Sequence, residues 1–361
     1  MKTIFLLAIP LMLISVFPGK RDTLNMIFIG DIMQHSSQIE SARKIAQKKK
    51  TETGVNGERY DYTGCFRFLK ETLNKADITV ANMESTFAGE PFTGYPSFSS
   101  PPSLLKAAVE AGTDIFLTAN NHINDKGSRG IEKTIRLFDS LGIKYTGVSR
   151  SRQERENTHP LVIESKGFRI AILNYTYGTN GVAVKPPYMV NLIDTAEIAS
   201  DLKRCNSGRY DLTVVCIHWG NEYSLSESSL QREIAGFIIS LGGDVIIGSH
   251  PHVPQPLVIN KSADGAEIAS VIFYSLGNAI SNMSAPYTRI GQMAVIRAVK
   301  DPLGKARLLE PDMEYIWTAR PGAIDDNYTI IPVSSFAGKP GEFKVRADYD
   351  KMMYYYSLLK K

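Results

Sequence analysis

The sequence has little cysteine and little net charge, and each shortage excludes a class of protein. Three cysteines in 361 residues are too few for a disulfide scaffold, and a chain of this length can bury a large core without one. Lys and Arg number 41 against 37 Asp and Glu, and a net charge of only +4 argues against a protein built around a basic stripe, so no nucleic-acid partner is expected. The hydrophobic fraction of 43% and the charged fraction of 22% exclude a largely disordered chain.

Long apolar runs are also scarce, and the one present lies at the N-terminus. The run from Ile4 to Phe17 follows Lys2 and is shorter than the ~20 residues of a membrane span. We therefore expect residues 1–19 to be a signal peptide or an N-terminal anchor; the alternative is a buried first strand or helix. No Ala-x-Ala pattern marks a cleavage site. The expectation is an exported protein, in the periplasm or at the outer face of the cytoplasmic membrane, peripheral to it or anchored by its N-terminus.

Export permits disulfide bonds, so the three cysteines need a separate interpretation. Cys216 lies in the apolar run from Leu212 to Ile217 and is expected to be a reduced core residue. Cys65 and Cys205 could pair, and the sequence leaves this open.

The rest of the chain alternates short apolar runs with amphipathic stretches. Ile115 to Leu117 is typical of a strand and Gly130 to Leu141 of a helix, and this order recurs several times before a series of strand-like runs. Repeated strand–helix units predict an α/β fold in which helices cover the sheets. We expect one large domain over residues 23–320 and a C-terminal extension over 321–361, with a closing helix near Tyr349 to Leu359.

Polar residues cluster directly after the predicted strands, where α/β folds bind ligands. Five of the six histidines fall in these clusters, and His159 is the exception. The clusters are Gly30-Asp31 with His35, Asn82-Met83-Glu84, Asn120-Asn121-His122 with Asp125, His218-Trp219 with Glu222, His250-Pro251-His252 and Gly277-Asn278.

This combination of Asp, Glu, Asn and His is the ligand set of Zn, Mn or Fe, and no cysteine takes part. We predict one or two divalent metal ions. The candidate ligands are Asp31, Glu84, Asn121, His218, His250 and His252. For each one a structural role is the alternative: Asp31 as a helix cap, Glu84 as a cap or lysine partner, Asn121 as a turn residue, His218 as a core histidine, and His250 and His252 as loop residues.

The other residues of these clusters are predicted to serve catalysis, substrate binding or support of the ligands. His122 is a candidate catalytic residue, and Asp125 either orients it or caps a helix. Supporting or substrate-binding roles are predicted for His35, Asn82, Asn120, Trp219, Glu222 and Asn278. Tyr175 and Tyr177 could line the pocket, although packing is the simpler role for them, as it is for Trp219 and Glu222.

Six of these motifs, in this order, resemble the bacterial poly-γ-glutamate capsule biosynthesis family, the CapA-like proteins. They are Gly-Asp, Asn-x-Glu, Ala-Asn-Asn-His, His-Trp-Gly-x-Glu-Tyr, Gly-Ser-His-Pro-His and Ser-Leu-Gly-Asn, between about Met26 and Val299. The resemblance implies a fold similar to calcineurin-like metallophosphoesterases: a four-layer α/β/β/α sandwich with two facing mixed sheets. It also implies that Asp31, Asn121, His218, His250 and His252 match metal-ligand positions, and that His122 matches the histidine that assists the leaving group.

The motifs depart from the phosphoesterase pattern in three places. Met33 stands where an Asp-x-His motif has its histidine, and His35 comes two residues later. Asn82-Met83-Glu84 replaces Gly-Asp, so Glu84 would be the bridging carboxylate, and Asn120 replaces the glycine of Gly-Asn-His. Phosphatase activity therefore does not follow from the resemblance.

Two functional hypotheses remain open. The first is a metal-dependent hydrolase or transferase that acts on an anionic cell-envelope polymer or a phosphoester. The second, which the resemblance also implies, is a non-catalytic accessory subunit of a membrane-bound capsule polymer synthase or export complex.

Overall fold

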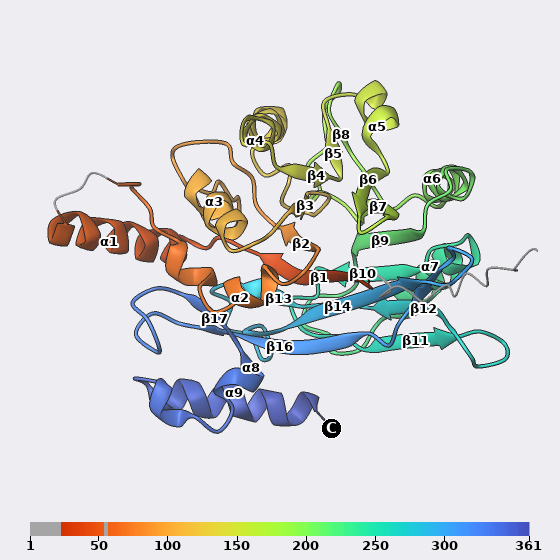
Figure 1. Ribbon diagram of the computed structural model, residues 1–361. Coiled ribbons are helices and arrows are strands. Elements are labelled where there is room, and N and C mark those ends of the chain that lie inside the picture. The colour runs from red at the N-terminus through yellow and green to blue at the C-terminus, as the bar shows by residue number, and fades with distance from the viewer. Residues whose placement is uncertain (1–22, 54–56, 361) are drawn as a thin grey trace, which may run out of the picture.

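The computed structural model describes residues 23–53 and 57–360, and its main feature is one connected sheet of 15 strands (Figure 1). Residues 1–19, predicted to be a leader, lie outside the described residues. The strands are β1 Thr23–Ile32, β2 Ile78–Met83, β3 Ile115–Leu117, β4 Lys144–Thr146, β5 Val148–Ser149, β6 Leu161–Ser165, β7 Phe168–Thr176, β8 Met189–Val190, β9 Leu212–His218, β10 Val245–Ser249, β11 Leu257–Lys261, β12 Ile268–Phe273, β13 Asn278–Ile280, β14 Ile290–Lys300, β15 Ala306–Leu308, β16 Asp312–Ala319 and β17 Thr329–Pro332.

The helices lie between and around these strands. They are α1 Ser36–Thr53, α2 Lys70–Leu73, α3 Pro102–Glu110, α4 Gly127–Ser140, α5 Arg152–Thr158, α6 Thr195–Ser207, α7 Ser229–Ser240, α8 Val333–Phe336 and α9 Arg346–Leu359, with 3₁₀ turns at Thr63–Phe66 and Pro340–Glu342. Within the described ranges, none of them is both long enough and apolar enough to cross a membrane.

The sheet folds into two halves that face each other. One half has the order β4-β3-β2-β1-β14, with β13 beside β1 and β16 and β17 beyond β14. The other has the order β12-β10-β9-β7-β6, with β11 beside β12, and β15 joins the halves by pairing with both β14 and β12. Phe28 and Val80 of the first half share one buried apolar cluster with Val214 and Val245 of the second. The predicted pair of facing sheets is thus confirmed, as two halves of one continuous sheet.

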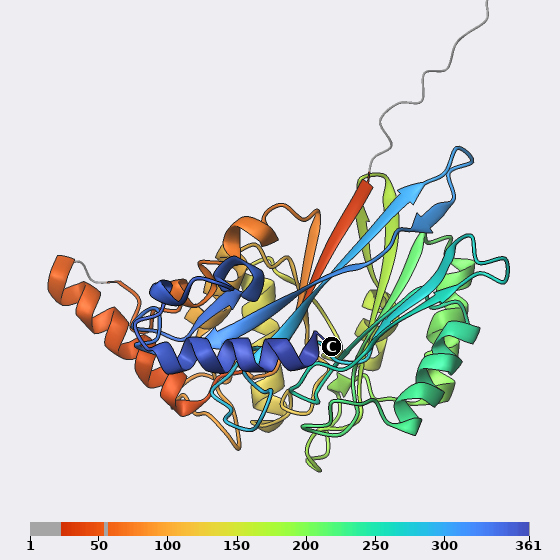
Figure 2. The ribbon, with the colours of Figure 1, turned by 90° about the horizontal axis from the view of Figure 1, so that it is seen from below.

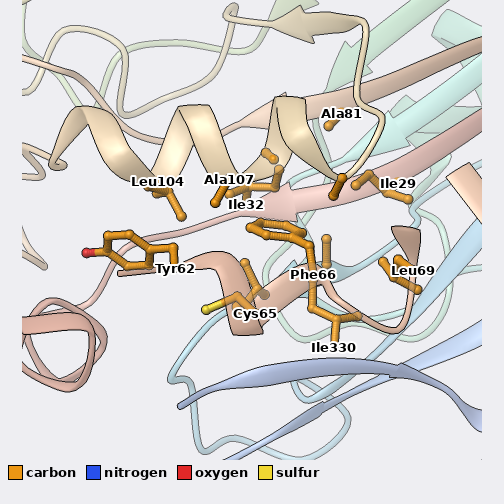
Figure 3. Close-up of a cluster of buried hydrophobic side chains, with 14 of the residues drawn as sticks. Ile29, Ile32, Tyr62, Cys65, Phe66, Leu69, Ala81, Leu104, Ala107 and Ile330 are labelled. Atoms are coloured by element: carbon orange, nitrogen blue, oxygen red, sulfur yellow. The ribbon is translucent and has the colours of Figure 1, made fainter. Parts of the chain in front are cut away.

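Helices cover the outer face of each half. Leu104 and Ala107 of α3 pack with Phe66 against Ile29 of β1 and Ala81 of β2 (Figure 3). Helices α6 and α7 pack against β7, β9 and β10 on the far side of the molecule from α1 (Figure 2). The result is the predicted α/β/β/α order of layers, because each half of the sheet buries one face against the other half and one against helices.

The C-terminal segment packs on the sheet at β14 and β16. Strand β17 pairs with β16, and α9 contributes Tyr349 and Met352 to a buried cluster that also contains Ile290 and Trp317. The predicted closing helix is present and begins at Arg346, three residues before the expected start.

All three cysteines are free and buried. Cys65 lies in the apolar cluster under α3, whereas Cys205 lies in the cluster under α6 and α7, so the two are in different outer layers. The pairing left open by the sequence is therefore not made in this fold.

One buried carboxylate makes the stability of the fold depend on pH. Asp244, before β10, accepts a 2.7 Å hydrogen bond from the Thr213 backbone N–H, and its burial raises its pKa to about 6. An unfolded Asp has a pKa near 3.9, so the folded state binds the proton more tightly and the free energy of unfolding falls as pH rises from about 4 to about 6.

We expect Asp244→Asn to remove this loss, because the amide oxygen can still accept the hydrogen bond. Between pH 4 and pH 7 the wild type should lose about 1–2 kcal/mol of unfolding free energy relative to the variant, as measured by urea denaturation at both values. Asp312→Asn, which removes an exposed carboxylate of β16, is the control. Parallel pH profiles for wild type and Asp244→Asn would contradict the prediction.

Candidate metal centre

The site lies where the carboxyl ends of parallel strands from both halves of the sheet meet. Asp31 is the last residue but one of β1 and accepts a 3.3 Å hydrogen bond from the backbone N–H of His250, which follows β10. Asn121 follows β3, and its Oδ1 lies 2.8 Å from Nε2 of His218 at the end of β9. The structure thus brings together, all buried, the predicted ligands Asp31, Glu84, Asn121, His218, His250 and His252.

Two glycines allow the strand ends to approach this closely. A Cβ atom at Gly30 would lie 1.8 Å from the carbonyl oxygen of Gly277, and one at Gly248 would lie 1.9 Å from that of Tyr274. The first approach sets Asp31 in register with Asn278. Any side chain at either glycine would push these strand ends apart.

Glu84 lies at the centre of the site and has no hydrogen-bond partner there. It is 0% exposed, and neither carboxylate oxygen is satisfied. Its Oε1 lies 3.7 Å from Nε2 of His218, 3.9 Å from Nε2 of His252 and 4.0 Å from Nε2 of His122. Burial, and then the nearby Asp31 carboxylate, raise the pKa of Glu84 well above its usual value. A buried carboxylate without a partner is costly, and a cation between it and the imidazoles would compensate it.

The ligand atoms form two groups that share this carboxylate. Glu84, His250 and His252 make one group, and Asp31, Glu84 and His218 make the other. Within each group the candidate ligand atoms lie within 4.8 Å of one another. The two groups contain the donors that two divalent ions would need, with Glu84 common to both. The family resemblance implied a bridging role for this residue.

The imidazoles of His218 and His250 are held in the neutral form that binds metals. Burial and the neighbouring histidines lower the pKa of His218 well below its usual value and that of His250 to about 3. His250 Nδ1 is buried without a partner, so its lone pair is available.

Asn278 orients the third imidazole. Its Nδ2 donates to the Thr288 carbonyl oxygen at 2.9 Å and to Ser281 Oγ at 3.0 Å, so its Oδ1 accepts from His252 Nδ1 at 3.0 Å. The lone pair of His252 is thereby placed on Nε2, the atom that faces Glu84. These three hydrogen bonds are consistent with the supporting role predicted for Asn278.

We expect Asn278→Ala to weaken metal binding, because His252 loses the acceptor that fixes its tautomer and ring orientation. Loss of such a partner costs roughly 10–100-fold in metal affinity. The measurement is a competition titration of Mn²⁺ against a chelating dye, with Asn260→Ala on β11 as the control amide. Equal affinity in Asn278→Ala and wild type would contradict the prediction.

His122 is positioned at the edge of the two ligand groups. Its Nδ1 lies 2.8 Å from Asp125 Oδ2, and the edge-on ring of Phe98 lies 4.5 Å from it between centroids. Asp125 also accepts a 2.7 Å hydrogen bond from the Phe98 backbone N–H, so the carboxylate is itself fixed. Asp125 therefore orients His122, the first of its two predicted roles, and leaves Nε2 directed towards Glu84.

Two predicted supporting amides connect the ligand-bearing segments. Asn82 Nδ2 donates to Asp31 Oδ1 at 2.8 Å. Asn120 Nδ2 donates to Asn82 Oδ1 at 3.2 Å, and its Oδ1 accepts from the His122 backbone N–H at 3.1 Å. His35 lies beside Phe98 and near His252 and His122, and burial lowers its pKa to about 4.

Two other predicted residues lie farther from the ligands. The Trp219 indole donates to the Tyr274 carbonyl oxygen at 2.9 Å within the cluster under α6 and α7, which is the packing role given above as the simpler of its alternatives. His218 faces the site, and Trp219 after it faces the opposite side of the sheet, because successive residues of an extended chain point to opposite sides. Glu222 is exposed at the border of the site, where its charge acts on Tyr177 and Tyr223.

Three supporting residues were not predicted from the sequence. Ser249 Oγ lies 2.8 Å from His218 Nδ1, and its place in Gly-Ser-His-Pro-His was a usable signal. Asn174 of β7 accepts from the Thr118 and Ala119 backbone N–H groups and donates to the Cys216 carbonyl oxygen, tying the segment before Asn121 to β9. Asn180 Oδ1 accepts from Asn121 Nδ2 at 3.1 Å. Neither asparagine lies in a motif of the sequence.

Unfavourable backbone conformations gather at the site. Positive φ angles occur at Asn180, Tyr223, His250 and His252, with values of 50°, 65°, 97° and 60°. Such conformations are uncommon for residues other than glycine and persist where the surroundings fix them, often at functional sites.

Comparison with known proteins identifies the family of the chain. The family model of the bacterial capsule synthesis protein PGA_cap matches residues 25–283, the span that carries all the candidate ligands. The capsule biosynthesis protein CapA of Bacillus anthracis is 28% identical over 292 residues, 77% of this chain and 64% of that protein. The PGA biosynthesis protein CapA of Bacillus subtilis is 26% identical over 304 residues, 81% of this chain and 72% of that protein.

Among solved structures, one from Staphylococcus aureus, described as a 5′-nucleotidase in complex with α-ketoglutarate, is similar with a TM-score of 0.48 and 11% identity. The match covers 81% of this chain and 54% of the Staphylococcus aureus chain. Because the family model accounts for most of the chain, the protein belongs to the bacterial capsule synthesis family PGA_cap.

Proposed function

We propose that the chain is a metal-dependent hydrolase or transferase that acts outside the cytoplasmic membrane, on a phosphoester or an anionic polymer of the cell envelope. The observation that carries the proposal is the Glu84 carboxylate: fully buried, without a hydrogen-bond partner, and common to both groups of metal ligands. Capsule synthesis, the family's role, is consistent with the cell envelope.

The donor set fits divalent metal ions. One ion would be held by Glu84, His250 and His252 and the other by Asp31, Glu84 and His218, with Asn121 Oδ1 close to the latter. Mn, Zn and Fe suit this mixture of imidazole and carboxylate ligands. Bound there, such ions would lower the pKa of water towards neutrality and polarise a phosphoryl or acyl oxygen.

The protein's own residues then position the proton donor. Asp125 holds the Nδ1–H of His122, so a proton on the other nitrogen, Nε2, faces the ligand groups. From there His122 can give that proton to the leaving oxygen, as a general acid does. Phe98 packs against the ring and excludes water from one side of it.

The test is replacement of His250 and His252 by alanine together. We expect loss of bound metal and of turnover on a panel of a phosphomonoester, a phosphodiester and a γ-glutamyl amide. Turnover that stays at the wild-type level both after chelation and in the double variant would refute the proposal.

The second candidate function is that of an accessory subunit of a membrane-bound capsule polymer synthase or export complex. The two CapA relatives support it, because both are named for biosynthesis and neither for hydrolysis. In that case the metal centre would bind polymer or stabilise the fold. Bound metal without turnover on any panel substrate, together with co-purification with a membrane synthase, would favour this candidate.

A further inference from the structure

Exposed tyrosines border the metal ligands on their solvent side. The ring of Tyr177 lies 4.5 Å from that of His250, and the ring of Tyr223 lies 6.4 Å from that of His252. Tyr95 lies 6.4 Å from Phe98, the ring that contacts His122. We call Tyr95, Tyr177 and Tyr223 the tyrosine rim.

The exposure of the tyrosine rim is not explained by packing of the fold. Tyr177 is 48% exposed, Tyr223 46% and Tyr95 70%, so each leaves much of its ring in water. Tyr223 is also held at a φ of 65°, with its backbone N–H donating to the Pro251 carbonyl oxygen at 2.8 Å. This conformation is uncommon for a bulky side chain, and such conformations cluster at functional sites. Half-exposed aromatic rings beside a polar site are suited to stacking on a ligand.

The charges around the rim are negative. Among the described residues, the ion-pair contacts of Asp31, Glu84 and Asp125 are all with histidines, and no lysine or arginine takes part. The exposed Glu222 carboxylate lies close enough to Tyr177 and Tyr223 to raise the pKa of both, which burial and this charge bring to about 12. A ligand carrying many negative charges would be repelled by Glu222 at this border.

Hydrogen-bonding groups for a neutral, hydroxyl-rich ligand are present beside the rim. Asn180 is exposed, and its Nδ2 lies 3.4 Å from His122 Nδ1, at the edge of the ligand groups. Glu222 is exposed on the other side, beside Tyr223. Carboxylate and amide groups next to aromatic faces offer both partners that a sugar ring needs, for its hydroxyls and for its apolar face.

We propose that the tyrosine rim binds the uncharged sugar ring of a phosphoester whose phosphoryl group is held at the metal ligands. The inference rests on the proposed function and narrows it, from anionic substrates in general to sugar phosphates. Tyr177 and Tyr223 supply the stacking faces. Asn180 donates hydrogen bonds to the hydroxyls or accepts them, and the Glu222 carboxylate accepts them.

The first experiment compares substrates of the Mn²⁺-loaded protein by kcat/KM. The probes are glucose 1-phosphate, glycerol 1-phosphate, adenosine monophosphate and an oligo-γ-glutamate. We expect glucose 1-phosphate to exceed glycerol 1-phosphate by at least about tenfold, and this ratio to fall about tenfold in Tyr177→Ala and in Tyr223→Ala. Tyr354→Ala, which removes a 60% exposed tyrosine of α9, should leave the ratio unchanged.

Three results would overturn the inference: a preference for the oligo-γ-glutamate, a preference for adenosine monophosphate over glucose 1-phosphate, or an unchanged ratio in both rim variants.

The second experiment separates the inference from the proposed function. It measures binding of glucose 1-phosphate and of inorganic phosphate to the Mn²⁺-loaded protein by calorimetry. Tighter binding of the sugar phosphate, lost in the rim variants, supports the inference even where no turnover is found and the hydrolase proposal fails. Equal binding of both probes overturns it.

Discussion

Replacing Glu84 by glutamine is expected to abolish metal binding and at the same time to stabilise the metal-free protein. The carboxylate is fully buried, its oxygens have no hydrogen-bond partner, and Asp31 lies nearby, so its charge is unfavourable when no cation is present. An uncompensated buried charge costs several kcal/mol, and the amide keeps the shape without the charge. Because the amide also lacks partners, we expect a gain of only about 2 kcal/mol, or roughly 3 °C in melting temperature for a chain of this size.

Metal should reverse this order of stability. At a free Mn²⁺ concentration of about 100 times the dissociation constant, binding at one site adds about 2.7 kcal/mol to wild type, and little to Glu84→Gln. Thermal melts with chelator and with Mn²⁺ measure both effects, with Glu71→Gln, an exposed partner of Lys75, as the control. A metal-free Glu84→Gln protein that melts below metal-free wild type would contradict the first expectation. A variant that gains as much from Mn²⁺ as wild type would show that this carboxylate is not a metal ligand.

Replacing His122 by alanine is expected to reduce kcat by about 10²–10⁴ and to leave the metal content near that of wild type. The two effects separate because His122 is outside both groups of ligands, although its Nε2 lies only 4.0 Å from Glu84 Oε1. Asp125→Asn should cause a smaller loss, because the ring remains but the carboxylate that orients it is gone. Metal analysis and kinetics on the same preparations, with Asp139→Asn as an exposed control, make the comparison. Loss of metal in His122→Ala would instead place His122 among the ligands.

Much of the site could be predicted because parallel strands end at one edge of a sheet. That rule placed Asp31, His218 and His250 together although they lie far apart in the chain. It could not tell which atoms touch: the link from Asn278 to His252, and the clamp of Asn174 between the two halves of the sheet, depend on side-chain directions.

The open points and the omissions also have physical causes. Trp219 follows His218, and the sequence left open whether it lines the site or packs. It packs under the helices, because neighbouring residues of an extended chain point to opposite sides. Helix α1 was not predicted from the sequence, because it buries little more than Gln38, Ser41 and Ala42 and so lacks a clear apolar stripe. Strand β16 was not predicted, because exposed and buried residues do not alternate along it: its first half is partly exposed and its second half is buried.

The central claim is that Glu84 is shared by two metal ions, and the most direct test is the amount of metal bound per chain. The measurement is elemental analysis of wild type and Glu84→Gln after incubation with Mn²⁺ and removal of free ions. We expect about two ions per wild-type chain and almost none per variant chain. A wild type that binds no metal, or a variant that keeps both ions, would contradict it.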